Sequence, residues 1–333
     1  MSQEKKVVER VSGWLRVFDD GSVDRTWTGP PEVKFMMDPV PPHDDFIDGV
    51  AVADATTDAG LKIRIYSPER RDADPKKLPV LVHFHGGGFC LSDADWHMYY
   101  TVYTRLSREA RAIVVSPYLR QAPEHRLPAA CDDGFAALVW LSSVARGGAG
   151  HPWLDGAADF GRVFLIGDSS GGNIVHQVAA RAGDEDLSPL KLAGAVPIHT
   201  DFCRTQRSKS EMEKAETPFL TPEMMDKLFA MALPEGATKE HPITCPMGEA
   251  AAPLETLKLP PYLYCMADHD LVRDRELEFY EAMKKAGKEV ELLTSHDVGH
   301  SFYLNKIAVD CNPKVAEETN KLFQGIIHFI NNH

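Results

Sequence analysis

The sequence predicts an α/β protein with a mostly parallel central sheet, helices on both faces and a helical cap. Nearly continuous apolar runs, such as residues 78–84, are typical of strands that are buried on both faces. Amphipathic helical patterns separate most of these runs, and strands that alternate with helices form parallel sheets. A long insertion near residues 200–250 breaks the alternation and supplies the predicted cap.

The N-terminal part of the chain predicts two antiparallel hairpins. Residues 13–27 predict two strands around an Asp-Gly turn, and residues 50–68 predict a second pair that turns near 58–60. Both hairpins should extend the central sheet at its start. Between them, the proline-rich residues 30–45 predict an ordered but irregular connection.

The rest of the chain predicts strands and helices in alternation. Strands are expected over 78–84, 112–116, 162–167, 192–198, 261–267 and 289–294. Helices are expected over 96–110, 132–145, 173–183, 221–234, 275–287 and 314–331. We therefore expect a single domain over residues 1–333, with cap elements from about 1–45 and 200–250. The alternative for the insertion is a peripheral helical layer that only packs against the sheet.

Composition and charge exclude several classes of function. The 333 residues carry a net charge of −13, and such an acidic surface repels the phosphate backbone of nucleic acids. The first residues lack the apolar segment of a secretory signal, and no apolar run is long enough to cross a membrane. We therefore expect a cytoplasmic monomer or weak dimer with no nucleic-acid or membrane partner.

Neither the cysteines nor the acidic residues predict a bound group. The six cysteines are scattered and form no C-x-x-C pair, so reduced thiols are expected. Outside residues 268–274, the only dense cluster of histidine and aspartate is His43 to Asp45, which is interpreted as a solvated loop. We expect no metal and no cofactor.

The strongest chemical signal is GDSSG at residues 167–171, which fits the pattern G-x-S-x-G between a predicted strand and a predicted helix. A strained turn in that setting lifts the serine hydroxyl clear of the sheet, at the positive end of the next helix. We expect Ser169 to be a nucleophile. The alternatives are a purely structural turn and attack by Ser170, whose backbone N–H is its more useful group.

A second signal is HGGG at residues 85–88, directly after a buried strand. Consecutive glycines let backbone N–H groups approach a ligand closely, and such groups can stabilise the oxyanion of an acyl-transfer transition state. We expect Gly87, Gly88 and Ser170 to form an oxyanion hole. His85 is expected to hold the shape of the loop, and His83 to be a satisfied histidine within the strand.

The third signal is the histidine that a serine nucleophile needs as its base. Where the nucleophile stands on such a turn, the acid and then the histidine follow it along the chain. His300 comes late, after a predicted strand and a glycine, and His296 is its main competitor. Asp268, Asp270 and Asp274 are candidates for the acid; Asp270 is favoured because it stands at the exit of a strand.

Taken together, these motifs resemble the plant carboxylesterases of the hormone-sensitive-lipase branch. HGGGF, GDSSGGN, APEHRLPAA, HPITCPMG, the Asp-Leu turn and GHSF occur here in the family order. The resemblance implies an α/β-hydrolase fold, with Ser169, Asp270 and His300 as catalytic residues and a cap built from N-terminal and mid-chain segments. One departure lies at residues 118–121, YLRQ, where the family commonly reads Asp-Tyr-Arg-Leu.

These signals predict a serine carboxylesterase that hydrolyses small to medium esters through an acyl-enzyme. Phe89, Met225 and Phe229 are expected to contact the substrate. The resemblance also implies two alternatives. Gibberellin receptors of this branch lack the histidine and bind hormone without turnover, whereas isoflavonoid dehydratases catalyse an elimination.

Overall fold

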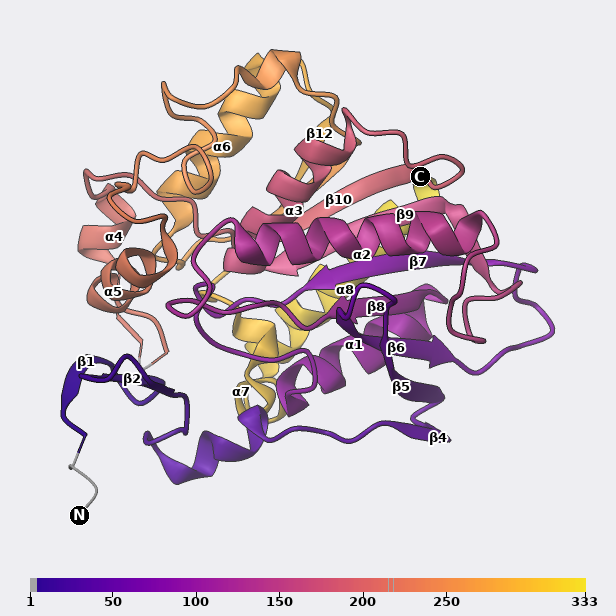
Figure 1. The fold of residues 1–333 in the computed structure, drawn as a ribbon, viewed down its shortest axis with the longest axis horizontal. Coiled ribbons are helices and arrows are strands. Elements are labelled where there is room, and N and C mark those ends of the chain that lie inside the picture. Colours follow the sequence, from indigo (N-terminus) through magenta and orange to yellow (C-terminus); the bar gives the residue numbers. More distant parts are fainter. Residues whose placement is uncertain (1–4, 215, 218) are drawn as a thin grey trace.

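The computed structural model describes residues 5–214, 216–217 and 219–333, and its centre is a nine-stranded sheet (Figure 1). The strand order is β12-β11-β10-β9-β7-β8-β6-β5-β4. Pairing is parallel from β12 to β8 and antiparallel from β8 to β4. The mostly parallel sheet expected from the sequence is therefore confirmed.

The strands of this sheet follow the apolar runs of the sequence. They are β4 (His43–Ile47), β5 (Val50–Thr56), β6 (Lys62–Pro68), β7 (Leu78–Phe84), β8 (Ile113–Pro117), β9 (Ala158–Asp168), β10 (Leu192–Ile198), β11 (Tyr262–Ala267) and β12 (Val290–Ser295). Every residue of β7, β8 and β11 is buried, because helices cover both faces of the sheet there.

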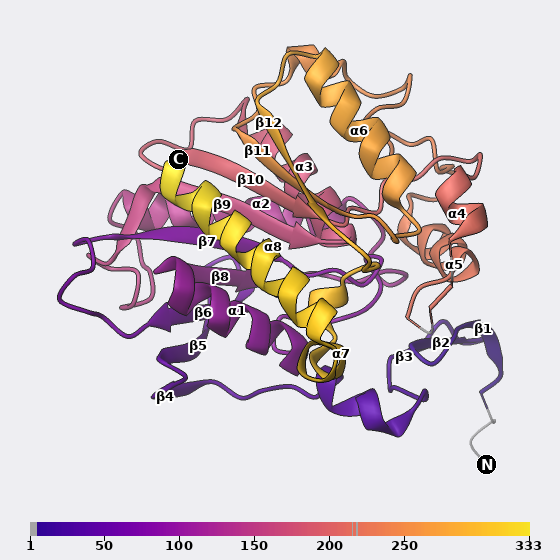
Figure 2. The same ribbon diagram turned by 180° about the vertical axis from the view of Figure 1, so that it is seen from behind.

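Two groups of helices cover the two faces. The helices are α1 (His97–Ala110), α2 (Ala129–Ala145), α3 (Ser170–Ala182), α4 (Lys209–Glu213), α5 (Pro222–Ala232), α6 (Arg273–Lys285), α7 (Lys306–Cys311) and α8 (Pro313–Asn332). Apolar side chains of α2, α3 and α6 share one buried cluster, and those of α1 and α8 share the other. Figure 2 shows α1 and α8 in front of the sheet, on the side opposite to α2.

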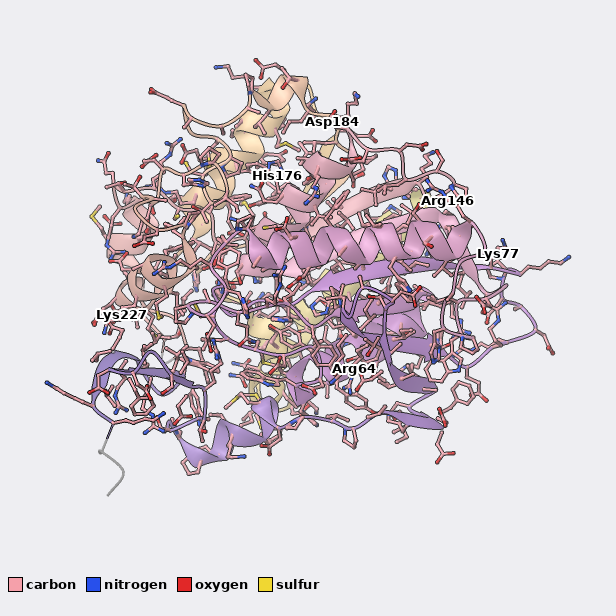
Figure 3. All side chains as sticks on the ribbon, in the orientation of Figure 1. Arg64, Lys77, Arg146, His176, Asp184 and Lys227 are labelled. Atoms are coloured by element: carbon pink, nitrogen blue, oxygen red, sulfur yellow. The ribbon has the colours of Figure 1, made fainter. Side chains whose placement is uncertain are left out.

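The first expected hairpin does not extend the central sheet. Its strands, β2 (Leu15–Phe18) and β3 (Val23–Asp24), pair instead with β1 (Val7–Val11) in a separate three-stranded sheet. Strand β1 packs against α5, and the Lys227 ammonium of that helix donates to the Arg10 carbonyl at 3.0 Å (Figure 3). The expectation was wrong because the hairpin pairs with β1, a strand that the sequence analysis did not predict, and this small sheet stays separate from the central one.

The region between the hairpins is more regular than expected. Residues Pro31–Met37 form a 3-10 helix, η1, whose Met36 and Met37 are buried. His43 to Asp45 was expected to be a solvated loop but belongs to the edge strand β4, which pairs with β5. Asp44 and Asp45 are exposed there, and charged side chains on an edge strand discourage pairing with another chain.

Most charged side chains lie on the surface, where water solvates them. Figure 3 shows Lys77, Arg146 and Asp184 near the rim of the molecule. Arg64 is the exception among the arginines: it is 1% exposed, and its guanidinium pairs with Asp54 at 2.9 Å. Within the described residues, no helix is long and apolar enough to cross a membrane.

Candidate active site

Ser169 stands on a strained turn between β9 and α3. Its φ of +52° and ψ of −122° lie in a region that non-glycine residues rarely adopt, at a cost of about 1–3 kcal/mol. A Cβ at Gly167 would lie 2.5 Å from the Gly171 carbonyl oxygen, and one at Gly171 would lie 2.0 Å from the Phe84 oxygen. Only glycine fits at both positions, so these two glycines permit the turn to form.

The two neighbouring serines have different surroundings. Ser169 is 8% exposed and lines a mostly apolar cavity. Ser170 is 1% exposed, and its hydroxyl accepts a hydrogen bond from the Phe89 N–H at 3.2 Å. Ser169 is therefore the hydroxyl that a ligand in the cavity can reach.

His300 and Asp270 are paired at the edge of the same cavity. Nδ1 of His300 lies 2.8 Å from Oδ2 of Asp270, which fixes the proton on Nδ1 and leaves Nε2 free to accept. Asp270 is fully buried and also accepts from the Val272 N–H at 3.1 Å. Both side chains come from loops that follow the adjacent parallel strands β11 and β12. Because parallel strands end at the same edge of the sheet, the two loops lie close together.

The pair shifts the pKa of each partner. Burial lowers the pKa of His300, but the negative charge of Asp270 and the hydrogen bond to it raise the pKa above its ordinary value. Burial raises the pKa of Asp270, and the facing His300 outweighs that effect and lowers it. The imidazolium form of His300 is therefore stabilised by its partner.

The other candidates for the base and the acid make their contacts outside the cavity. Nδ1 of His296 lies 3.3 Å from Asp268, and the His296 side chain is 63% exposed. Asp268 also accepts from the Asp297 N–H at 2.8 Å, so it organises a surface turn. Asp274 accepts from the Ser210 N–H at 2.8 Å and ties α6 to α4.

The glycine loop after β7 presents free backbone donors to the cavity. Gly87 and Gly88 line the cavity and have φ angles of +102° and +60°, which side chains rarely tolerate. A Cβ at Gly87 would lie 2.5 Å from the Leu91 oxygen. Within the described part of the chain, no group accepts a hydrogen bond from the N–H of Gly87, Gly88 or Ser170.

His83 and His85, which precede the glycines of this loop, make hydrogen bonds within the protein. Nδ1 of His85 lies 2.9 Å from the Gly86 carbonyl oxygen and holds the loop, as expected. Nδ1 of His83 lies 2.8 Å from the Ser116 hydroxyl, between β7 and β8. Burial lowers the pKa of His83 to about 4, so this side chain is neutral near pH 7.

The cavity has a volume of about 310 Å³ and a mostly apolar wall. Trp14 and Met36 reach it from the N-terminal segment, whereas Met225 and Phe229 reach it from α5 in the insertion. Phe89 behaves differently from the expectation: it is absent from the described residues that line the cavity. Its ring packs against that of Phe229, with centroids 6.3 Å apart, and so supports the wall from behind.

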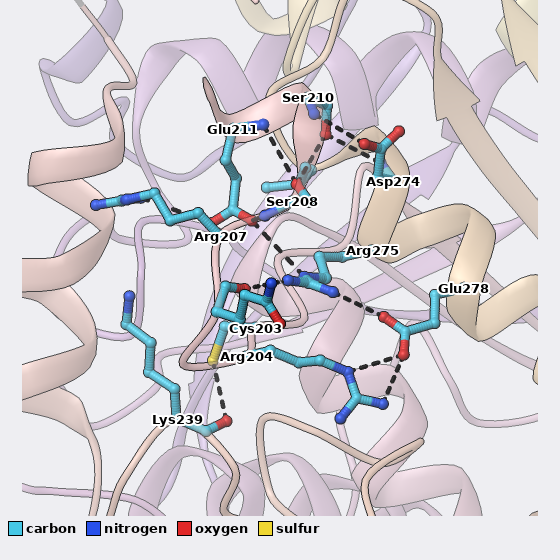
Figure 4. A network of polar contacts seen from close by, with 12 residues as sticks. Cys203, Arg204, Arg207, Ser208, Ser210, Glu211, Lys239, Asp274, Arg275 and Glu278 are labelled. Atoms are coloured by element: carbon cyan, nitrogen blue, oxygen red, sulfur yellow. Dashed lines mark hydrogen bonds and ion pairs between the residues drawn. The ribbon is translucent and has the colours of Figure 1, made fainter. Parts of the chain in front are cut away.

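The start of the insertion is held to α6 by polar contacts. The Arg204 guanidinium pairs with Glu278 at 2.5 Å, and the Ser210 N–H donates to Asp274 at 2.8 Å (Figure 4). Arg275 of α6 also pairs with Glu211 at 3.6 Å. These contacts fix the chain that leaves β10 next to the candidate site.

Asp201 lies in that chain and was missed by the sequence analysis. It is 6% exposed, lines the cavity with Ser169 and His300, and its Oδ1 is buried without a hydrogen-bond partner among the described residues. Burial raises its pKa to about 8. One signal could have found it: Asp201 follows a buried parallel strand, at the sheet edge where ligands bind in such folds.

Comparisons with known proteins agree with this architecture. A family model for the alpha/beta hydrolase fold matches residues 81–304. A protein named Probable carboxylesterase 6, from Arabidopsis thaliana, is 36% identical over 90% of this chain and 85% of its own length. A gibberellin receptor from the same plant is 37% identical over 81% of this chain and 80% of its own.

A solved structure gives the same answer at the level of the fold. The esterase of the archaeon Pyrobaculum calidifontis superimposes with a TM-score of 0.68 at 27% identity, covering 84% of this chain and 85% of its own. The strand order, the strained serine turn and these similarities lead to one conclusion. The chain belongs to the alpha/beta hydrolase fold family, with plant carboxylesterases and gibberellin receptors among its relatives.

Proposed function

We propose that this protein is a serine carboxylesterase. The observation that carries the proposal is that Ser169, on its strained turn, and His300 border one apolar cavity, and that the buried Asp270 pairs with His300 behind it. The carboxylesterase and esterase relatives support ester hydrolysis on this fold. In this proposal Ser169 is the nucleophile, His300 the general base and Asp270 the acid that orients it.

The reaction begins when Nε2 of His300 accepts the proton of the Ser169 hydroxyl as that oxygen attacks the ester carbonyl. Asp270 holds the Nδ1 proton and stabilises the imidazolium that forms. His300 then protonates the leaving alcohol as the tetrahedral intermediate collapses to an acyl-enzyme. Water attacks the acyl-enzyme by the same steps and frees Ser169.

The negative charge of the tetrahedral intermediate develops on the former carbonyl oxygen. The N–H groups of Gly87, Gly88 and Ser170 are proposed to donate to it, and their lack of other acceptors in the described structure supports this role. One such donor is worth about 2.7–4 kcal/mol in the transition state. Because these donors are backbone groups, they need no rearrangement when the charge appears.

The N-terminal segment and the insertion are proposed to form a cap over the site. Trp14 and Met36 from the first, and Met225 and Phe229 from the second, supply much of the apolar wall. A cavity of about 310 Å³ with such a wall favours small to medium esters with uncharged, mainly apolar groups. No described lysine or arginine lines it, so an anionic group on the substrate would stay unpaired.

A hormone-binding role is the second candidate, because a gibberellin receptor is as similar to this chain as the carboxylesterase is. The His300–Asp270 pair favours the hydrolase, since a receptor that only binds has no need of a base beside the serine. Gibberellin binding measured by calorimetry, together with turnover of a nitrophenyl ester, separates the two. Binding without turnover would support the receptor.

The serine mechanism is tested by Ser169→Ala. The folded variant should lose turnover of a nitrophenyl ester, because it lacks the hydroxyl proposed to attack the ester carbonyl. A phosphonate ester should add once to the unmodified protein, and peptide mapping should place the adduct on Ser169. Ser170→Ala is the matched control: it keeps the backbone N–H and should still be labelled. Normal turnover by folded Ser169→Ala would overturn the proposal.

A further inference from the structure

Asp201 occupies an unusual position for an ionisable side chain. It follows the carboxyl end of β10, and its own N–H points toward the Ser169 carbonyl oxygen at 3.5 Å. The side chain borders the cavity beside Ser169 and His300, yet the proposed hydrolysis uses none of its atoms. Because the proposed reaction does not use this buried carboxyl, its position at the cavity needs another explanation.

The Asp201 carboxyl is unsatisfied within the protein. No described residue forms a hydrogen bond with its side chain, and Oδ1 is enclosed by the protein. The residue itself borders the cavity. A ligand there would therefore meet the carboxyl at its other oxygen, Oδ2, and would supply the partner that the protein does not.

Burial, more than the charged groups around it, keeps Asp201 neutral. It faces His300 from the loop after β12, Asp270 from the loop after β11 and Asp168 from β9; Cys203, Cys90 and Tyr264 are also near. Burial raises the pKa of Asp201 to about 8, the proximity of His300 opposes that shift, and Asp168 and Asp270 add to it. At pH 7 the group is therefore a carboxylic acid, which both donates and accepts a hydrogen bond.

We propose that Asp201 is a specificity-determining residue that hydrogen-bonds an uncharged oxygen of the substrate, near the reacting carbonyl. The preferred substrates are then oxygenated esters, carrying a hydroxyl, keto or ring oxygen, over hydrocarbon esters of the same size. This inference rests on the proposed esterase function and names the substrate class for that site.

The charge of the site decides between the possible ligand groups. The neighbouring carboxylates Asp168 and Asp270 disfavour a carboxylate on the ligand. A cationic group would have to leave water for a mainly apolar cavity, and it would require Asp201 to ionise first. An uncharged oxygen meets the neutral acid without either cost, so it is the group that the site fits.

The test compares matched esters on Asp201 variants. One pair is nitrophenyl butyrate and nitrophenyl 3-hydroxybutyrate; a second pair places the hydroxyl on the alcohol side instead. For at least one pair, Asp201→Leu should lower the ratio of kcat/KM for the oxygenated ester to that for the plain ester by about tenfold. Asp201→Asn should keep the ratio within about threefold, because an amide still donates and accepts.

A control variant and a third ester distinguish the outcomes. Met225→Leu changes another wall of the cavity and should alter both members of a pair alike.

An ammonium-bearing butyrate tests for a charged ligand. If the wild type prefers this ester and both Asp201 variants lose that preference, a site for a neutral oxygen is wrong. If plain butyrate is hydrolysed but no ratio changes in Asp201→Leu, this inference fails alone. If plain butyrate is not hydrolysed at all, the esterase proposal fails.

The pH dependence gives a readout that a merely structural residue would not move. Above about pH 8 Asp201 loses its proton and can no longer donate to a keto oxygen. The wild-type ratio for nitrophenyl 3-oxobutyrate over nitrophenyl butyrate should then fall, while that of Asp201→Asn stays flat. Because the folded pKa is raised, the wild type should also lose stability relative to Asp201→Asn as pH rises from about 4 to about 8. A ratio that is flat across pH 8 in both proteins would overturn the proposal.

Discussion

At the scale of single residues, the structure separates groups that look alike in the sequence. Asp268, Asp270 and Asp274 follow the same strand within a few residues, but only Asp270 lies within hydrogen-bond distance of His300. Asp270 is also the only one of the three that is fully buried. A buried carboxylate beside an imidazole strengthens their interaction, since little water is present to screen it.

The pH dependence of turnover follows from this pair. His300 must be neutral to accept the Ser169 proton, and Asp270 raises the pKa of His300. Activity should therefore rise with pH, with a midpoint above the ordinary histidine value of about 6.5. The pH profile of kcat/KM for a nitrophenyl acetate measures this midpoint. A midpoint below 6 would contradict the pairing.

Asp270→Asn should lower kcat by about 10³–10⁴-fold, because an amide can hold the wrong imidazole tautomer. The same change should move the pH midpoint down, since the negative charge beside His300 is gone. Asp268→Asn and Asp274→Asn are matched controls and should leave the midpoint near its wild-type position. A larger loss in either control would assign the acid to that residue instead.

At the scale of elements, α5 is the helix that shapes the cavity. Thr221 caps its N-terminus by accepting from the Met224 N–H at 3.1 Å, and Pro222 occupies the first turn. Its buried face carries Met225 and Phe229 into the cavity wall. The identity of these side chains should therefore set the size of the ester that fits, while the reacting groups stay on the loops of the sheet.

Phe229→Ala should enlarge the cavity and raise kcat/KM for long-chain or branched acyl esters relative to acetate by about tenfold, a change of about 1.4 kcal/mol. The acetate rate should change less, because a small acyl group needs little of this wall. Steady-state kinetics over a series of acyl chain lengths measures the shift. Met212→Ala on the same insertion, at a side chain that is 66% exposed, is the control. Equal loss on every ester would indicate a packing role instead.

At the scale of the whole molecule, segments from the N-terminal and the C-terminal parts of the chain both line the cavity. The N-terminal sheet lies beside α5 in both views (Figures 1 and 2). Trp14 lines the cavity, and its ring lies 4.6 Å from that of Trp27 and 6.0 Å from that of Phe219. Val315 of α8 lines the same space from the C-terminal side. The cavity thus exists only when the whole chain is folded.

Trp14→Ala should raise KM for medium-sized esters by about tenfold and leave kcat for acetate nearly unchanged. The reason is that the indole supplies apolar contact area to the ligand and none of the reacting atoms. Michaelis–Menten kinetics on butyrate and acetate esters measures both parameters. Val8→Ala, on the same small sheet but 58% exposed, is the control. A loss of kcat on acetate would assign the residue to the folding of the site.

The sequence by itself determined most strands of the central sheet, the helices that alternate with them and the serine turn. Apolar runs, helical periodicity and the glycines around Ser169 act over a few residues, so local sequence suffices to predict them. The family order of the motifs also pointed to His300 and Asp270, which the structure brings to 2.8 Å. These local patterns specify a helix, strand or turn because steric fit and burial act within a single element.

Only the tertiary structure decided how distant elements meet. It paired the first hairpin with β1, which packs against α5, instead of with the central sheet. It also made His43 to Asp45 an edge strand and put Phe89 behind the cavity wall. It also exposed Asp201 as an unpartnered carboxyl beside Ser169. A missing partner and a shared cavity are relations between segments far apart in the chain, and no short stretch of sequence contains them.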